Sequence, residues 1–466
     1  MSNYTNPYSA GTGNSKLFRI PAILTLKNGR VIACGDIRYG NGTDDPANIE
    51  TVIRYSDDNC KTWSDIVWVN HFNDMEDADH NQAIPTSASF CDSAICQDNN
   101  GVIYHVCDAC PAYMGLWSAG TYGKGNGYID GRLALCDKTS HEKAESTKLD
   151  KEHYPYYVAE YNEDGFAPVL RFSDNSSYKS YFVDRFYNIY EKNGEEYSPV
   201  LIKQMNKDGS LNDTDVIANI FYAYAPIKIY PTYYLWVRKS FDNGESWSDG
   251  KILNLEIGSR GFTGFSPGIG ICLEKDGKQR VIFSVYDNND SREYTSVIYT
   301  DDGESWKRSE KANQVGLAGK SSETQFVLMN NNVLRMYSRN IAGYISYCDS
   351  ADYGETWGEY KLDKEVDIYM LVDTKALYRV GEGRLTHTAE GFHLTGCSDE
   401  LDYKHPPLCS YSLFSDYFFY EIGDVICIGT PKILYYCFPK GEEDVVAKTR
   451  LATEELYKIL YENKKK

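Results

Sequence analysis

A short turn motif recurs along this 466-residue chain and constrains its fold more than any other feature. In the shared pattern, S-x-D-x-G-x-[ST]-W, Ser and Asp hydrogen-bond the backbone of their own turn. Gly takes a positive φ, and Trp covers the adjoining sheet. Copies occupy 56–63, 240–247 and 350–357, with a shortened copy at 300–306. Such recurrence predicts a repeat architecture such as a β-propeller, whose radial blades protect their strand edges.

Short apolar runs separated by turns fill the sequence between these copies. The runs Ala22–Leu26 and Val31–Cys34 flank Asn28-Gly29, which predicts a β-hairpin. Helical periodicity is visible only in the tail, at about 449–463. The predicted fold class is therefore all-β.

The spacing of the motif copies suggests how the chain is divided. The last intervals, from Trp247 to Trp306 and from there to Trp357, each fit one four-stranded blade. The first interval is far longer, and the pattern of residues within it changes between Tyr113 and Ile227. We expect a first propeller part at 1–112, an inserted β module at 113–227, the rest of the propeller at 228–440 and a C-terminal tail, with the candidate helix, at 441–466.

Composition narrows the range of partners. The net charge is -19, from 67 acidic and 48 basic residues, which disfavours nucleic acid and anionic lipid surfaces. An anionic small substrate would need a local arginine cluster. No apolar run is long enough to span a membrane, and no signal peptide is visible. The compartment is left open: intracellular, or secreted and given without its leader.

Cysteine usage points to thiols more than to bridges or metal. The 13 cysteines have no regular spacing, so we expect mostly reduced thiols. Cys107 and Cys110 form a lone CxxC, which favours two buried small residues over a zinc site.

The segment Leu17–Pro21 (LFRIP), together with the turn motifs, resembles the [FY]-R-I-P signature and Asp boxes of sialidases. Segments 44–50, 233–236 and 266–271 are similar to the larger bacterial-type sialidases, which carry a small inserted β domain. The resemblance covers roughly 16–413. It implies a six-bladed β-propeller with the site at its hub.

The resemblance also implies site residues in the first part of the chain. Arg19, in the FRIP motif, matches the first of three arginines that clamp the sialic acid carboxylate. Arg38 matches an arginine that reaches the O4 side of the sugar. Asp44 matches the acid/base aspartate, with the neighbouring Asp45 as a rival, and Asp92 matches an aspartate that lines the pocket.

The remaining implied residues lie in the last third. Glu323, in Ser322–Gln325, matches the base partner of the nucleophile, and Arg339 matches the second clamp arginine. Tyr411 matches the nucleophile. The third clamp arginine must lie between Trp357 and Tyr411; Arg379 fits the family turn better than Arg384, although the Asn of that turn is absent.

The implied activity is that of an exo-α-sialidase acting on terminal sialic acids of glycoconjugates with retention. A neutral tyrosine hydroxyl suits this substrate because the anomeric carbon bears a carboxylate that would repel a carboxylate nucleophile. No metal or organic cofactor is expected, and a monomer is expected. The alternatives are a trans-sialidase, a non-catalytic sialic-acid-binding propeller and an interaction propeller that uses its turn motifs only as scaffold.

Overall fold

The protein, described as a computed structural model, consists almost wholly of β-strands. The described residues are 4–363 and five later strands. Short gaps fall at 59–60, 116–124, 144–147, 260, 290–291, 311, 313–320, 329–331 and 341–344. The later strands are 386–388, 391–393, 417–418, 424–428 and 432–437. The predicted all-β fold class is confirmed.

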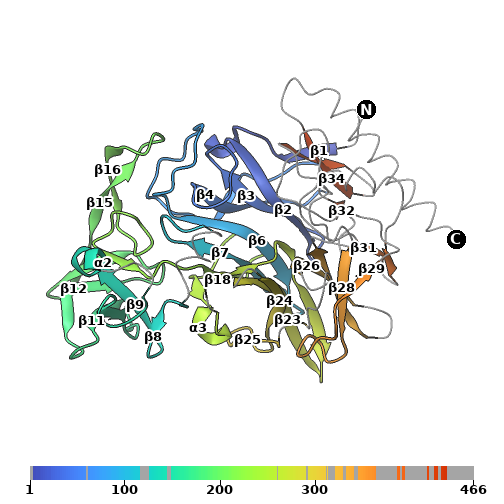
Figure 1. Ribbon diagram of the computed structural model, residues 1–466. Helices are drawn as coiled ribbons and strands as arrows, with labels where there is room; N and C mark the ends of the chain where they lie inside the picture. Colours follow the sequence, from blue (N-terminus) through green and yellow to red (C-terminus); the bar gives the residue numbers. More distant parts are fainter. Residues whose placement is uncertain are drawn as a thin grey trace.

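Four successive sheets make up most of the main body (Figure 1). The first contains β2 (Leu17–Thr25), β3 (Val31–Arg38), β4 (Ile49–Ser56) and β5 (Val67–Asn70). The second contains β21 (Gly268–Ile269), β6 (Ser89–Gln97), β7 (Ile103–Cys110), β18 (Tyr234–Ser240) and β19 (Lys251–Ile252). The third contains β20 (Thr263–Phe265), β22 (Ile271–Lys275), β23 (Lys278–Asn289), β24 (Arg292–Thr300) and β25 (Lys307–Arg308). The fourth contains β26 (Ser321–Leu328), β27 (Leu334–Asn340), β28 (Ile345–Ser350) and β29 (Lys361–Asp363).

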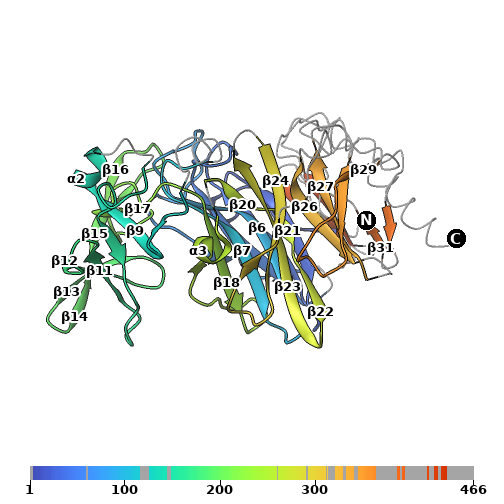
Figure 2. The ribbon, with the colours of Figure 1, turned by 60° about the horizontal axis from the view of Figure 1, so that its bottom comes forward.

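These sheets contact one another in chain order, as the blades of a propeller do (Figure 2). Strand β6 lies against β2, β3 and β4; β20 lies against β7 and β18; and β26 lies against β23 and β24. The N-terminal strand β1 (Tyr4–Tyr8) pairs with β33 (Asp424–Ile428), in a sheet with β34 (Lys432–Cys437) and β32 (Tyr417–Phe418). Through the pairing of β1 with β33, strands from the first and last described parts of the chain share one sheet, and β33 also contacts β2. The number of blades stays a prediction.

The hairpin predicted around Asn28 is confirmed. Strands β2 and β3 pair antiparallel, with Ala22 opposite Cys34. Gly29 has a φ of 88°, the left-handed conformation that a tight turn requires. All residues of β3 are buried, so this hairpin is anchored in the core.

The recurring turns are stabilised by their own side chains. In the copy at 240–247, Asp242 accepts hydrogen bonds from the Ser246 backbone N at 2.9 Å and from its Oγ at 2.5 Å. Ser240 Oγ donates to the same carboxylate at 2.8 Å. Trp306 and Trp357 of the later copies are buried in clusters between the sheets.

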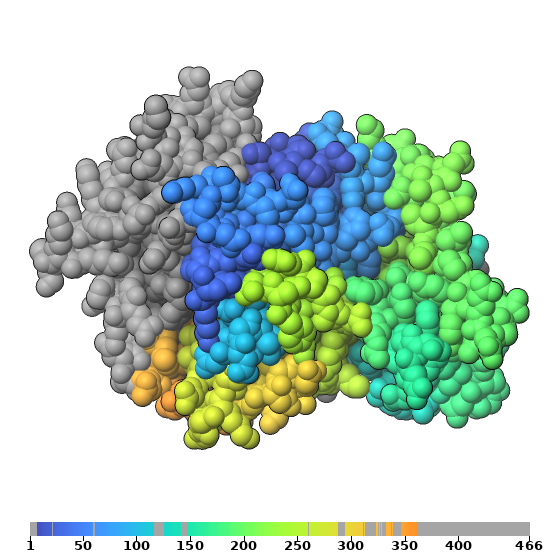
Figure 3. Space-filling view, turned by 180° about the vertical axis from the view of Figure 1, so that it is seen from behind, coloured from blue at the N-terminus to red at the C-terminus, as the bar shows by residue number. Residues whose placement is uncertain are grey.

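Residues 128–229 build a second body of sheet beside the propeller, visible as a separate lobe in Figures 1 and 3. Its strands are β8 (Tyr128–Ile129), β9 (Arg132–Asp137), β10 (Tyr156–Val158), β11 (Ala167–Arg171), β12 (Ser177–Val183), β13 (Ile189–Asn193), β14 (Glu196–Pro199) and β17 (Ile227–Ile229), with a hairpin of β15 (Leu201–Met205) and β16 (Leu211–Ile217). The sheet lies within or next to the predicted insertion at 113–227, but that domain division stays a prediction.

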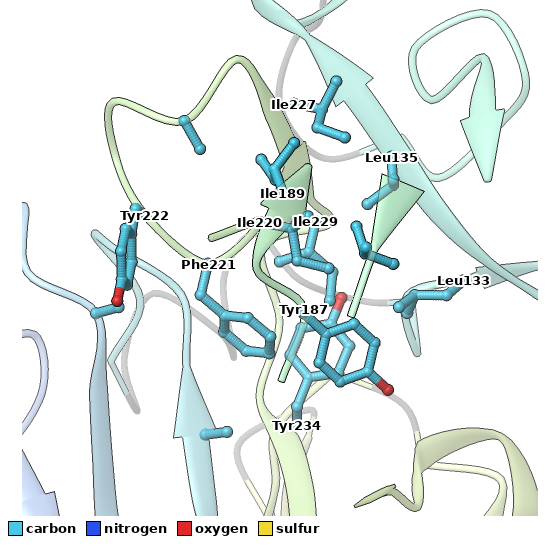
Figure 4. Close-up of a cluster of buried hydrophobic side chains, with 14 of the residues drawn as sticks. Leu133, Leu135, Tyr187, Ile189, Ile220, Phe221, Tyr222, Ile227, Ile229 and Tyr234 are labelled. Carbon is cyan, nitrogen blue, oxygen red and sulfur yellow. The ribbon is translucent and has the colours of Figure 1, made fainter. Parts of the chain in front are cut away.

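Helices are short, and the lobe shares a core with the propeller. In the described residues, the helical segments are a 3-10 turn (Thr12–Asn14), α2 (Lys138–Lys143) and α3 (Asn254–Ile257). Phe221 and Tyr187 of the lobe pack with Tyr234 and Trp236 of β18 in one buried cluster (Figure 4). In the described part of the chain, none of the helices has the length and apolar character needed to cross a membrane. The tail predicted at 441–466 lies outside the described residues.

Candidate functional site

Bulges in three different sheets mark the positions of three predicted site residues. Register shifts interrupt the pairing of β2 with β3, of β6 with β7 and of β26 with β27. At or within the displaced segments lie Arg19, Asp92 and Glu323. Ile20 and Asp92 have φ values of 53° and 57°, a strained conformation for residues other than glycine. Bulges re-aim side chains and are common beside functional sites.

Arg19, Arg38 and Asp44 come together as one group, which we call the arginine cluster. Asp44 Oδ1 accepts from Arg19 Nη1 at 2.7 Å and from Arg38 Nη1 at 2.6 Å. Both guanidinium groups also donate to the Gly42 carbonyl, at 3.1 Å each, and Arg38 donates to the Thr43 carbonyl at 2.9 Å. The loop between β3 and β4 is thus held to the two arginines by the hydrogen bonds that its carbonyls and Asp44 accept.

The members of the arginine cluster differ sharply in exposure. The side chains of Arg19 and Arg38 are 3% and 1% exposed, whereas that of Asp44 is 57% exposed. Desolvation opposes ionisation of Asp44, but the charges of both arginines outweigh it and hold its pKa well below the usual range. The arrangement therefore presents two buried cations whose facing carboxylate is open to solvent. Such a pair is suited to bind the carboxylate of a small molecule.

A second acidic residue lies behind the arginine cluster. Asp36 is fully buried, and its Oδ2 accepts from Arg38 Nη2 at 3.1 Å and from the Asp92 backbone N at 3.4 Å. Burial raises the pKa of Asp36 to about 8, although the charge of Arg38 opposes the shift. Asp36 therefore ties Arg38 to the bulge that contains Asp92. We did not predict this residue, although an acid two positions before Arg38 in a buried strand faces the same side of the sheet.

The remaining predicted residues are described in part. Glu323 is 5% exposed in β26. Strand β27 pairs with β26 on both sides of the bulge, so the backbone of Arg339 lies opposite Glu323. Tyr411 and Arg379, with its alternative Arg384, lie outside the described residues.

Asp45 takes a different position from Asp44, although sequence alone made them rivals. Its Oδ1 accepts from Ser89 Oγ at 2.5 Å, and its Oδ2 accepts from Tyr233 OH at 3.0 Å. The hydroxyls come from two other strands or strand ends. Of the two carboxylates, Asp44 is the one that accepts hydrogen bonds from Arg19 and Arg38.

Two groups of described residues have the donors and spacing that could hold a metal ion. In each, one ligand atom per residue lies within 4.8 Å of the others; the groups are Asp45, Cys91 and Cys110, and Glu50, His71 and Asp77. The structure shows Cys91 and Cys110 as thiols that donate to Asp45, at 2.8 and 3.3 Å. Glu50 and His71 form an ion pair, and Glu50 also accepts from the Phe72 backbone N at 2.8 Å.

Comparison with known proteins gives one consistent result. No family model matches the chain. Sialidase B of Streptococcus pneumoniae is 31% identical over 362 residues, covering 72% of this chain and 48% of that protein. The chain spans about half the length of the curated relatives it matches.

Solved structures agree with the curated relative. The intramolecular trans-sialidase from Ruminococcus gnavus, solved with oseltamivir carboxylate, has a TM-score of 0.67 and 32% identity, covering 78% of this chain and 74% of that chain. A leech intramolecular trans-sialidase, complexed with 2,7-anhydro-Neu5Ac, has a TM-score of 0.66 and 28% identity, covering 78% and 54%. These similarities confirm the predicted β-propeller class and family. The chain belongs to the sialidase family.

Proposed function

We propose that this protein cleaves terminal sialic acids from glycoconjugates, as an exo-acting glycosidase. The observation that carries the proposal is the arginine cluster, in which two buried guanidinium groups converge on one exposed carboxylate. A sialic acid bears its carboxylate on the carbon where the bond breaks. Binding that carboxylate therefore places the scissile bond beside Asp44.

Substrate binding and acid catalysis are linked in this proposal. The substrate carboxylate takes the place of Asp44 on Arg19, with Arg339 and Arg379 as the other clamp arginines. Once Asp44 leaves the guanidinium group, the interaction that lowers its pKa is weakened. Asp44 then gains a proton more readily and donates it to the departing glycan oxygen. The substrate thus converts an ion-pair partner into the general acid.

Bond cleavage follows a two-step course with retention. Tyr411 attacks the anomeric carbon, and Glu323 takes the phenol proton, because an unperturbed tyrosine has a pKa near 10. The neutral hydroxyl approaches the anionic substrate without the repulsion that a carboxylate would meet. The arginines stabilise charge in the oxocarbenium-like transition state. The step needs no metal or organic cofactor.

The acceptor in the second step distinguishes two reactions. With water, Asp44 acts as base and the product is the free sialic acid. With the sugar's own 7-hydroxyl, an oxygen bridge forms between C2 and C7, and the hydroxyl proton goes to Asp44. In both reactions the bond between C2 and the Tyr411 oxygen breaks, and Glu323 returns a proton to the phenolate. The similarity to two intramolecular trans-sialidases, one of them complexed with 2,7-anhydro-Neu5Ac, favours this internal transfer as a second candidate.

Product analysis tests the proposal. The purified protein is incubated with sialyllactose, and the released sugar is identified by mass spectrometry. Free Neu5Ac supports hydrolysis, and a product lighter by one water supports internal transfer. Release of neither product, with binding of a sialic acid analogue retained, would leave the non-catalytic binding propeller as the function.

A further inference from the structure

The carboxylate of Asp45 points into the protein and is hydrogen-bonded on both oxygens. Oδ1 accepts from Ser89 Oγ at 2.5 Å. Oδ2 accepts from Cys91 Sγ at 2.8 Å, from Tyr233 OH at 3.0 Å and from Cys110 Sγ at 3.3 Å. Hydrogen bonds to both oxygens of a carboxylate fix its orientation as well as its position. We call these four donors the Asp45 clamp.

The Asp45 clamp is built on one sheet. Ser89 and Cys91 begin β6, Cys110 ends β7, and Tyr233 directly precedes β18; these three strands are neighbours. All four residues are buried, with exposed fractions of 4% or less. The donors are therefore fixed by the sheet and do not depend on the loop that they hold.

The backbone of the same loop is also held closely. Gly115 approaches so near that a Cβ there would lie 2.3 Å from the Asp45 carbonyl oxygen. Gly42, at the other side of Asp44, has a φ of 84°, and its carbonyl accepts from Arg19 and Arg38. The loop therefore has one attachment to the sheet beneath it and one to the arginines.

The two attachments respond differently to substrate. Asp44 forms ion pairs with Arg19, which would bind the substrate carboxylate, and with Arg38, which is expected at the O4 side of the sugar, so substrate weakens both pairs. The Asp45 clamp is formed by other residues, none of which is among the proposed substrate-binding residues. Once substrate is bound, the clamp is the attachment that still fixes the loop beside the scissile bond.

We propose that Asp45 is a positioning residue, whose four-donor clamp holds the loop so that Asp44 meets the leaving oxygen after substrate displaces it from the arginines. The inference rests on the proposed function. It predicts that weakening the clamp impairs proton donation selectively. A loss of folded protein, by contrast, would lower turnover of every substrate alike.

The test compares two substrates with different demand for an acid. An aryl sialoside with an acidic phenol needs little protonation of its leaving group, whereas sialyllactose needs it fully. For Asp45→Asn we expect kcat/KM on sialyllactose to fall about 10- to 100-fold through misplacement of Asp44. The kcat/KM on the aryl sialoside should change far less, because it covers the steps up to departure of the aryl group and not the later step in which Asp44 acts as base. Asp44→Asn provides the reference for complete loss of the acid.

Milder variants keep the test decisive if Asp45→Asn does not fold. Tyr233→Phe removes one donor without opening a cavity, and Cys91→Ala removes another. Cys96→Ala is the matched control, because Cys96 is equally buried on the same strand but lies in the core cluster under β18. Tyr233→Phe and Cys91→Ala should lower turnover of sialyllactose selectively, and Cys96→Ala should not.

The outcomes separate the inference from the function beneath it. Selective loss on sialyllactose in the clamp variants supports the inference. Equal loss on both substrates, or no loss, overturns it while the proposed function stands. A wild-type protein that releases no sugar from either substrate refutes the proposed function, and the inference falls with it.

Discussion

The recurring outer turns and the arginine cluster satisfy their polar groups in opposite ways. In the turns, Asp242 is bonded to residues two and four positions away in sequence. In the candidate site, Asp44 is hydrogen-bonded to Arg19, 25 positions away in sequence, and Asp45 to Tyr233, 188 positions away. Each turn finds its hydrogen-bond partners within its own few residues. The candidate site, by contrast, forms only when strands that are distant in sequence pack together. Stability and chemistry are thereby assigned to different parts of the same sheets.

The outer turns also join neighbouring sheets in a regular way. In three motif copies, the glutamate before the Ser or Thr forms an ion pair with an arginine or lysine of a neighbouring sheet. The pairs are Arg30–Glu245 at 3.1 Å, Lys239–Glu304 at 2.5 Å and Arg280–Glu355 at 3.0 Å. Because these pairs are partly exposed, each adds little alone. The arginine cluster differs, since Arg19 and Arg38 are buried and Arg19 lies at a bulge.

The largest effect on turnover is expected from substitutions in the candidate site, which leave the recurring turns unchanged. For Glu323→Gln we expect kcat to fall about 10²- to 10⁴-fold, because the amide cannot accept the nucleophile's proton. Tyr411→Phe should lose at least as much. Circular dichroism should show both variants folded. The control is Glu274→Gln on the exposed side of β22; comparable activity in Glu323→Gln would contradict the assigned role.

Removing the charge of Asp44 should separate binding from catalysis. In Asp44→Asn, Arg19 loses its ion pair with Asp44 while Arg38 keeps Asp36, so on Arg19 a carboxylate ligand competes with a neutral amide in place of a carboxylate. We expect a sialic acid analogue to bind several-fold more tightly in calorimetry. Turnover of sialyllactose should fall about 10²-fold or more because the acid is lost. Weaker binding of the analogue would contradict the exchange of carboxylates on Arg19.

An outer turn should respond in stability and not in turnover. Asp242→Ala removes three hydrogen bonds from one turn, and we expect a loss of about 1–2 kcal/mol in the free energy of unfolding. Values of kcat for the folded variant should match the wild type. The control is Asp213→Ala in β16, where the backbone carbonyl and not the carboxylate accepts from Lys203 at 2.9 Å.

The pH dependence of that loss gives a further check. Desolvation would raise the pKa of Asp242, but hydrogen bonds from Ser246 and Ser240 outweigh it and lower the pKa. A lowered pKa in the folded state gives stability above the unfolded pKa, near 4, that is lost as pH falls. The difference in stability between wild type and Asp242→Ala should therefore shrink below about pH 4. A constant difference would mean that the carboxylate's charge plays no part.

The smallest effect belongs to the links between sheets. Glu355→Gln should cost no more than about 1 kcal/mol, since its side chain is 40% exposed. The loss should diminish in high salt, as denaturant unfolding can measure. A loss as large as that of Asp242→Ala, independent of salt, would show that the turns depend on their neighbours.

Sequence predicted the local features well because local patterns carry them. The Asn28-Gly29 hairpin and the turns follow from residues that are adjacent in the chain. Arg19, Arg38 and Asp44 followed from a family resemblance, and the structure brings these three together, although their roles stay proposals. The three bulges could not be predicted from the sequence, because a register shift depends on the partner strand.

Buried polar partners were the other feature that sequence could not reveal. Asp36 lies among apolar residues of β3, and only the fold shows its bond to Arg38. Asp45 looked equivalent to Asp44 because nothing nearby distinguishes adjacent aspartates. Its partners Tyr233 and Cys110 come from strands far along the chain.

A crystal structure with a sialic acid transition-state analogue tests the central claim most directly. The account predicts that the analogue's carboxylate lies within hydrogen-bond distance of the Arg19 guanidinium, with Asp44 moved off Arg19 and Asp45 still bonded to Tyr233. An analogue bound elsewhere, or bound while Asp44 still pairs with Arg19, would contradict it.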